Sequence, residues 1–123
     1  MIIIDNGIMM KEVINIFYCL SDKNRIRILM MLSRKSLCVC EITEILELSA
    51  STVSNHLSIL KAAGFINDSK DGKWVNYSLN IETHDPKIQE IFQLLPTWLN
   101  SDEIINADIA KINSIDRKIL CSN

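Results

Sequence analysis

Cys38 and Cys40, separated by one residue, are the most chemically distinctive pair in the sequence. Thiolates bind soft ions such as Cu(I), zinc and iron–sulfur clusters, and the same reasoning extends to trivalent arsenic. Residues i and i+2 share a face in extended backbone but point to opposite sides of a helix. Because a helix is predicted directly after the pair, we expect both thiolates to bind one ion only if the start of that helix is unwound. The alternative is two buried free thiols that act as small apolar side chains.

A second group of candidate residues lies in a helix that is predicted over residues 49–64. Val53, Leu57 and Leu60 recur at the spacing of an inward face, Ser49 can cap the start, and Gly64 suits the end. Small hydroxyl and amide side chains let a helix approach the base edges of the major groove closely. The candidates for contacts with bases or adjacent phosphates are Ser51, Thr52, Ser54 and Asn55.

Cations that could position such a helix on DNA lie near its end and in the segment after it. Lys61, Lys70 and Lys73 are expected to contact the phosphate backbone, the alternative being a solvated lysine-rich turn. His56 has two interpretations: it contacts a phosphate, or it packs beside Leu57.

The elements that position these residues are mainly helical. Apolar spacing predicts helices near residues 9–20, 22–33, 41–46, 49–64, 88–99 and 105–119, with Ser21 as a cap for the second and Pro86 at the start of the fifth. Residues 65–80 alternate in the manner of a β-hairpin that turns at Asp71-Gly72. Helices joined by a short turn and followed by a hairpin predict a winged helix-turn-helix, with residues 40–64 as the helix pair and 65–80 as the wing.

Length and composition limit the possible classes of protein. The 123 residues fit one domain over residues 1–123, and no apolar run approaches the ~20 residues of a membrane helix. Asp5 and Asn6 interrupt the apolar start, which therefore does not resemble a signal peptide, and we expect a cytoplasmic protein with free thiols and no disulfide framework. The net charge of −2 requires any DNA contact to be local.

An enzyme is not expected. No glycine-rich phosphate loop or G-x-S-x-G motif is present, and the two histidines, His56 and His84, lie far apart in the sequence without an obvious nucleophile beside them.

Between residues 9 and 80 the sequence resembles the ArsR/SmtB family of metal-responsive repressors. The strings that carry the resemblance are Leu20-Ser21-Asp22, Asn24-Arg25-Ile26-Arg27-Ile28-Leu29, Leu37-Cys38-Val39-Cys40-Glu41-Ile42, Ser51-Thr52-Val53-Ser54-Asn55-His56-Leu57, Leu60-Lys61-Ala62-Ala63-Gly64 and Gly72-Lys73-Trp74-Val75-Asn76-Tyr77-Ser78-Leu79. The resemblance implies a homodimer, built from helices within residues 1–20 and 85–120, that binds near-palindromic operator DNA until an inducer releases it. Half-sites would lie about one helical turn apart, or a multiple of it.

The resemblance also implies an inducer. The string from Leu37 to Glu41 resembles the metalloid-binding box of arsenic-responsive members, which would take As(III) or Sb(III) and need no cofactor for DNA binding. Cadmium- and lead-responsive members share this box but add cysteines from an N-terminal arm, and residues 1–18 contain none. Zinc-sensing members use histidine and carboxylate pairs on the fifth helix, where no histidine follows His84, so that site is expected to be absent.

One departure from the family pattern concerns the third ligand. Arsenic-responsive members of the best-known type have a cysteine three places after the second, and here that place is Thr43. Cys121 is a candidate third ligand that could reach across the dimer, whereas Cys19 is expected in the core; otherwise solvent or a small thiol would complete the site.

Three further functions are compatible with these residues. The first is a cadmium- or lead-responsive repressor, and the second is a repressor in which Cys38 or Cys40 is oxidised. The third is a constitutive DNA-binding or protein-interaction winged helix with inert cysteines.

Overall fold

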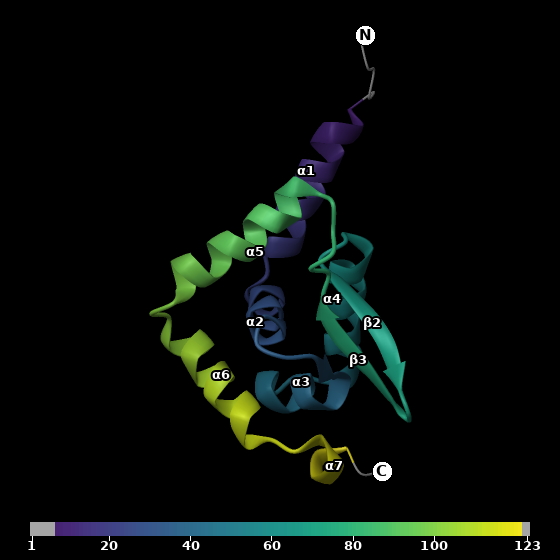
Figure 1. The fold of residues 1–123 in the computed structure, drawn as a ribbon, viewed down its shortest axis with the longest axis vertical. Helices are drawn as coiled ribbons and strands as arrows, with labels where there is room; N and C mark the ends of the chain where they lie inside the picture. Colours follow the sequence, from purple (N-terminus) through teal and green to yellow (C-terminus); the bar gives the residue numbers. More distant parts are fainter. Residues whose placement is uncertain (1–6, 122–123) are drawn as a thin grey trace.

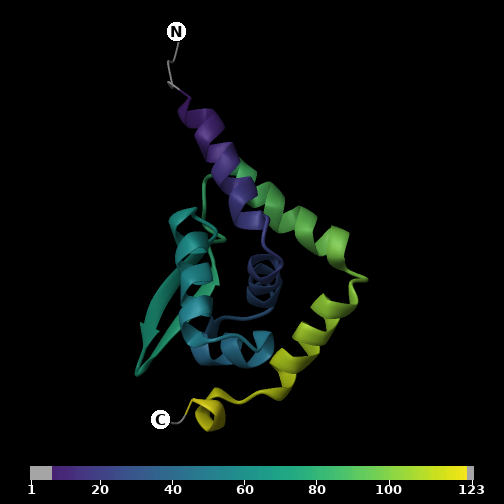
Figure 2. The ribbon, with the colours of Figure 1, turned by 180° about the vertical axis from the view of Figure 1, so that it is seen from behind.

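The computed structural model describes residues 7–121, and its central helix is α2 (Lys23–Leu32). Ile28 and Met31 of α2 are fully buried. In Figure 1 the helix lies between α4 with the β-hairpin on one side and α5 with α6 on the other, and Figure 2 shows the same order from behind. The other helices are α1 (Ile8–Leu20), α3 (Val39–Leu46), α4 (Ala50–Ala62), α5 (Pro86–Leu99), α6 (Glu103–Ser114) and α7 (Arg117–Leu120).

Three strands form one antiparallel sheet in the order β1-β3-β2. The hairpin of β2 (Ile66–Asp71) and β3 (Trp74–Leu79) confirms the predicted wing, but its turn is Gly72-Lys73, one residue later than predicted, because Asp71 pairs with Trp74. The short strand β1 (Leu37–Cys38) was not predicted; it pairs with β3 so that Cys38 lies opposite Asn76. Two residues are too few for a sequence pattern, but they attach the wing to the segment that contains the cysteine pair.

The ends of the two helices on either side of α3 are fixed by local side chains. Ser49 caps α4 as predicted, since its hydroxyl accepts a hydrogen bond from the Thr52 N–H at 3.2 Å. Gly64 follows α4 with a φ of 90°, a left-handed conformation that favours glycine. Ser21 does not cap α2. Asp22 does so, because its carboxylate accepts from two N–H groups of the first turn, whereas Ser21 ends α1.

The predicted sixth helix is divided into α6 and α7. Ile115 is extended, and the carboxylate of Asp116 caps a new helix by accepting from the Lys118 N–H at 2.9 Å. α6 packs against α2, where the Arg27 guanidinium donates to both oxygens of the buried Asp108 carboxylate, each at 2.9 Å. The break after α6 turns the chain back under α3, which Figures 1 and 2 show.

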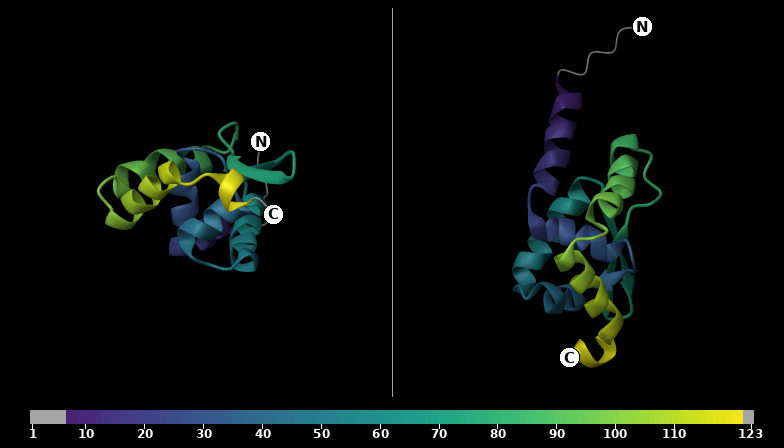
Figure 3. Two further views of the ribbon diagram at one scale, coloured as in Figure 1. Left: turned by 90° about the horizontal axis from the view of Figure 1, so that it is seen from below. Right: turned by 90° about the vertical axis from the view of Figure 1, so that its left-hand side faces the viewer.

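The apolar face of α1 is only partly used within the chain. Ile16 and Cys19 are buried, which confirms Cys19 as a core residue, whereas Ile14 and Phe17 of the predicted stripe are 60% and 66% exposed. Figure 3 shows α1 projecting from the body of the molecule. Among the described residues, no helix is both long and apolar enough to cross a bilayer.

Candidate functional site

The first candidate surface is the start of α4. Ser51, Thr52, Ser54 and Asn55 are all exposed, while Val53 of the same segment is fully buried. The Ser49 hydroxyl lies 3.2 Å from that of Ser51 and donates to that of Thr52 at 2.9 Å. The helix therefore presents small hydroxyl and amide groups to the outside, which is the property that reading of a major groove requires.

His56 does not belong to this surface. It is 7% exposed, and its Nδ1 lies 3.1 Å from an Nη1 of Arg25, which is itself buried. The guanidinium also donates to the carbonyl oxygens of Tyr18 and Cys19, and thereby joins the end of α1 to α2 and α4. The prediction of a phosphate contact from His56 is wrong because its ring faces inward to this arginine, and the packing interpretation holds.

The three candidate lysines are exposed but differ in their partners. Lys61 forms an ion pair with Asp68 at 2.9 Å, so its charge is partly offset. Lys70 lies near the end of β2, Lys73 lies in the turn of the wing, and the ammonium of Lys73 is 5.1 Å from the ring centre of Trp74. These two cations are exposed at the tip of the wing.

The second candidate site is the cysteine pair. Cys38 has extended backbone at the N-cap of α3, and Cys40 is the second residue of the helix. Their Sγ atoms are 3.1 Å apart. The expectation that the helix must unwind is therefore wrong, because the extended backbone of Cys38 already brings its sulfur to the side of Cys40.

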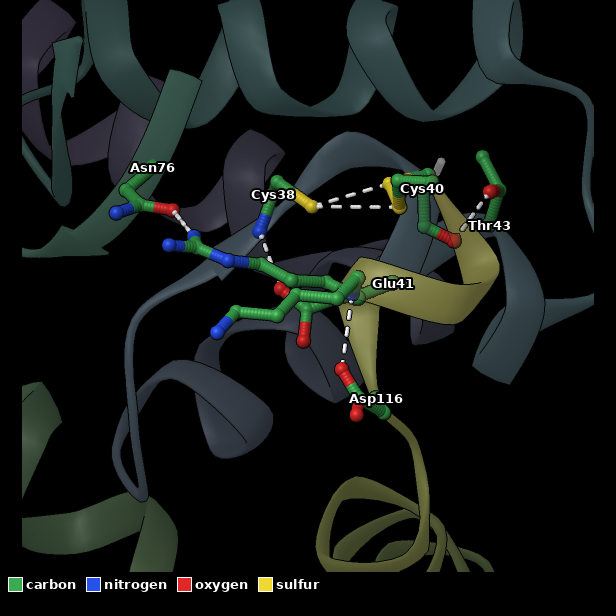
Figure 4. Close-up of a disulfide and its surroundings, with 9 residues drawn as sticks. Cys38, Cys40, Glu41, Thr43, Asn76 and Asp116 are labelled. Carbon is green, nitrogen blue, oxygen red and sulfur yellow. Dashed lines mark hydrogen bonds between the residues drawn. A yellow bond between two sulfur atoms is a disulfide. The ribbon is translucent and has the colours of Figure 1, made fainter. Parts of the chain in front are cut away.

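Cys121, at the end of α7, completes a cluster of three sulfurs (Figure 4). It forms a disulfide with Cys40 over a Cα–Cα distance of 6.1 Å, and its Sγ lies 3.8 Å from that of Cys38. All three sulfurs lie within 4.8 Å of one another. The structure departs from the expectation of free thiols, because Cys40 and Cys121 are bonded, and it brings Cys121 to the pair within its own chain.

The surroundings of Cys38 favour a neutral thiol. The residue is 2% exposed, and this burial raises the pKa of its thiol, although hydrogen bonds from the N–H groups of Glu41 and Cys40 act in the opposite direction. The carboxylate of Glu41 accepts from the Cys38 N–H at 3.0 Å and so fixes the backbone at the start of α3.

Thr43 occupies the position at which a third cysteine of the same segment would lie. Its hydroxyl donates to the Cys40 carbonyl at 2.8 Å. With Cys38, Cys40 and Trp74 it lines an open cleft of about 350 Å³, through which a small solute can reach the sulfurs. The third sulfur thus comes from the distant Cys121 and not from α3.

Sequence reasoning missed Arg117, which connects α7 to the wing. Its guanidinium donates to Asn76 Oδ1 and to Asp71 Oδ2, both at 2.6 Å, and lies 4.3 Å from the ring centre of Trp74. The hydrogen bond and charge of Arg117 lower the pKa of the Asp71 carboxyl. A cation four residues before Cys121 was the available signal, but nothing in the sequence indicated that it faces the wing.

Comparisons with known proteins agree with this architecture. A family model described as bacterial regulatory protein, arsR family, matches residues 22–68. An arsenic resistance transcriptional regulator of Pseudomonas putida is 34% identical over 109 residues, covering 83% of this chain and 85% of the relative. The arsenical resistance operon repressor of Escherichia coli is 33% identical over 113 residues, covering 89% and 86%. A cadmium resistance regulatory protein homolog of Staphylococcus aureus is 39% identical over 82 residues, covering 66% and 68%.

Solved structures give the same fold. HlyU from Vibrio cholerae superposes with a TM-score of 0.64 at 26% identity, covering 80% of this chain and all of that one. A homodimeric winged helix-turn-helix DNA-binding domain from Mycobacterium bovis gives 0.66 at 18% identity, covering 84% and 93%. The predicted winged helix-turn-helix fold is therefore confirmed. With relatives of matching length at more than 30% identity, the chain belongs to the ArsR family of bacterial regulatory proteins, which are DNA-binding transcriptional regulators and not enzymes.

Proposed function

We propose that this protein is a repressor that binds operator DNA as a homodimer and leaves it when trivalent arsenic or antimony binds Cys38, Cys40 and Cys121. One observation carries the proposal: sulfurs from positions 38, 40 and 121 converge within 4.8 Å, although 81 residues separate the second from the third. A set of three sulfurs with no nitrogen or oxygen ligand suits a soft, thiophilic ion. The arsenic-resistance relatives support the same inducer.

Inducer binding starts from the reduced cluster. A small cellular thiol first reduces the Cys40–Cys121 disulfide and is itself oxidised to its disulfide, leaving three protein thiols. Arsenite, As(OH)₃, then exchanges its three hydroxyl groups for three sulfurs, and three water molecules leave with the thiol protons. The cleft beside Cys38 and Cys40 gives arsenite its approach, and reduction of the Cys40–Cys121 disulfide leaves three thiols in one place, which must separate to take one atom between them.

DNA binding rests on α4 and the wing. Ser51, Thr52, Ser54 and Asn55 would contact base edges or adjacent phosphates, and Lys70 and Lys73, with Lys61, would contact the backbone. Because Cys38 caps α3 and lies opposite Asn76 of β3, a change at its sulfur acts on both the helix before α4 and the wing. DNA as the partner implies a cytoplasmic location.

Dimerisation would use the exposed apolar side chains of α1 and α5. Met10, Ile14 and Phe17 of α1 are 69%, 60% and 66% exposed, and Trp98 of α5 is 69% exposed. Such side chains rarely cluster on the surface of a monomer, which supports burial against a second copy. The inner face of α6, by contrast, is covered by its own chain through Asp108 and Ile112.

A redox-responsive repressor is the second candidate, and the Cys40–Cys121 disulfide favours it. Peroxide would oxidise the two thiols in two steps. The first thiol reacts with peroxide to give a sulfenic acid and water, and the second thiol then reacts with the sulfenic acid to give the disulfide and another water. In this second candidate the disulfide form, rather than an arsenic-bound form, leaves DNA.

The experiment that tests the proposal is a release titration. Operator duplexes are selected from a random-sequence library with fully reduced protein, and release is followed by fluorescence anisotropy as arsenite, antimonite, cadmium or peroxide is added. We expect release by arsenite and antimonite at lower concentrations than by cadmium. Release by cadmium alone or peroxide alone would replace the arsenic proposal by a cadmium- or redox-responsive repressor, and no release by any of them would leave a constitutive DNA-binding protein.

A further inference from the structure

We infer that Arg117 is a positioning residue that transmits the state of the three-cysteine cluster to the tip of the wing, an inference that rests on the proposed function. The cluster and the wing tip are both contacted by α7, which has only four residues. Cys121 brings one end of this helix to the sulfurs, and Arg117 brings the other end to the hairpin.

The link between the two ends of α7 is short and direct. The Cys121 N–H donates to the Arg117 carbonyl at 2.7 Å, so the two residues belong to a single helical turn. Asp116 caps that turn by accepting from the Lys118 N–H. A displacement of the Cys121 sulfur therefore also displaces the Arg117 backbone.

The link from Arg117 to the wing involves three residues on both sides of the turn. Asp71 is the last residue of β2, Trp74 is the first of β3, and the two are paired across the hairpin. The guanidinium binds the Asp71 carboxylate, lies over the Trp74 ring and donates to Asn76, which Figure 4 shows beside Cys38. The fork of a guanidinium fixes orientation as well as charge, which a lysine cannot do.

The two states of the cluster place Cys121 differently. In the disulfide its sulfur is bonded to that of Cys40, whereas three thiolates around one ion need that ion between their sulfurs. The change moves Cys121, and with it α7 and Arg117. Lys70 and Lys73 directly precede Asp71 and Trp74, two of the residues that Arg117 contacts, so the movement alters how the wing cations and the Asp71 carboxylate face DNA.

The test compares Arg117→Ala with Lys118→Ala, which removes the same charge from the neighbouring exposed position. Arsenite binding is measured without DNA by loss of free thiols, and release is measured on each variant's own operator complex. For Arg117→Ala we expect arsenite binding to be kept and the concentration for half-release to rise about tenfold, a usual size for coupling between two sites. Lys118→Ala should release as the unmodified protein does, and Arg117→Lys should regain only part of the response.

A spectroscopic measurement separates this inference from the proposed function. In a Trp98→Phe background, Trp74 is the remaining tryptophan, and its emission should change on arsenite binding and on reduction of the disulfide by dithiothreitol. Arg117→Ala should abolish both changes. If arsenite fails to release the unmodified protein, the arsenic proposal fails; if release and Trp74 emission respond equally with and without Arg117, the positioning role fails.

Discussion

The proposed DNA-reading face and the cysteine cluster are built in opposite ways. The face takes four exposed side chains from five consecutive positions of one helix, Ser51 to Asn55, so each can be changed without disturbing the core. The cluster takes sulfurs from two distant segments, and its most buried residue, Cys38, is 2% exposed. The side chains of the first region are therefore largely independent of one another, whereas the second region depends on how the chain is folded around it.

The two regions meet at α3 and the wing. Cys38 caps α3, and α3 packs against α4. Cys38 also pairs in the sheet with Asn76, which Arg117 contacts. This arrangement predicts that changes in the face alter operator affinity whether or not the inducer is present, and that changes in the cluster alter release alone.

The largest effect is expected from Cys38→Ser. Loss of the Cys38 sulfur should abolish release by arsenite because no three-thiolate site remains, while the operator is still bound, since serine has nearly the shape of cysteine and leaves the backbone pairing with Asn76 in place. Anisotropy titration with and without arsenite measures both quantities. The matched control is Cys19→Ser, a buried cysteine outside the cluster, which should keep release. A Cys38→Ser protein that still leaves DNA with arsenite would contradict the division between the regions.

An intermediate effect is expected from Asn55→Ala. A good base contact contributes about 1–3 kcal/mol of discrimination, so the affinity for the selected operator should fall while arsenite binding is kept. Asn113→Ala, an exposed asparagine on α6, serves as the control. An operator affinity equal to that of the control would remove Asn55 from the reading face.

The smallest effect concerns the pKa of Asp71. Arg117 holds this pKa below its ordinary value, so their ion pair contributes in the folded state above the ordinary value of 3.8 and is lost as pH falls through the lowered one. In Arg117→Ala the pKa of Asp71 should rise toward 3.8, and NMR titration of the side-chain carboxyl carbon measures it. Asp22 is the internal control: burial opposes its lowered pKa, but its own backbone N–H partners maintain it without Arg117. An unchanged Asp71 pKa would show that α7 does not hold the wing tip.

Local signals in the sequence were sufficient to predict the ends of α4 and its exposed residues. Ser49 and Gly64 mark the ends of α4 through bonds and dihedrals within a few residues, and the turn signal at Asp71-Gly72 located the hairpin to within one residue of its turn at Gly72-Lys73. The exposure of Ser51 to Asn55 follows from the spacing of Val53, Leu57 and Leu60. The same locality explains the miss at His56, because its partner Arg25 comes from another helix.

The cysteine cluster could not be predicted from local sequence signals, because it depends on contacts between distant segments. The sequence shows that Cys38 and Cys40 are one residue apart. Their sulfurs are aligned because Cys38, at the N-cap of α3, has extended backbone and pairs with β3. The approach of Cys121 depends on the break at Ile115, which a continuous apolar pattern concealed. Periodicity also identified Ile14 and Phe17 as apolar without indicating whether the same chain or a second one covers them.

The sulfur bridge also makes a ring of most of the chain. A bond between Cys40 and Cys121, or a shared ion, closes a loop of 81 residues that contains α4, the wing, α5 and α6. Such a closure removes freedom from the unfolded chain worth about 4 to 5 kcal/mol. We therefore expect the reduced, unliganded protein to be the form that proteases cleave most readily.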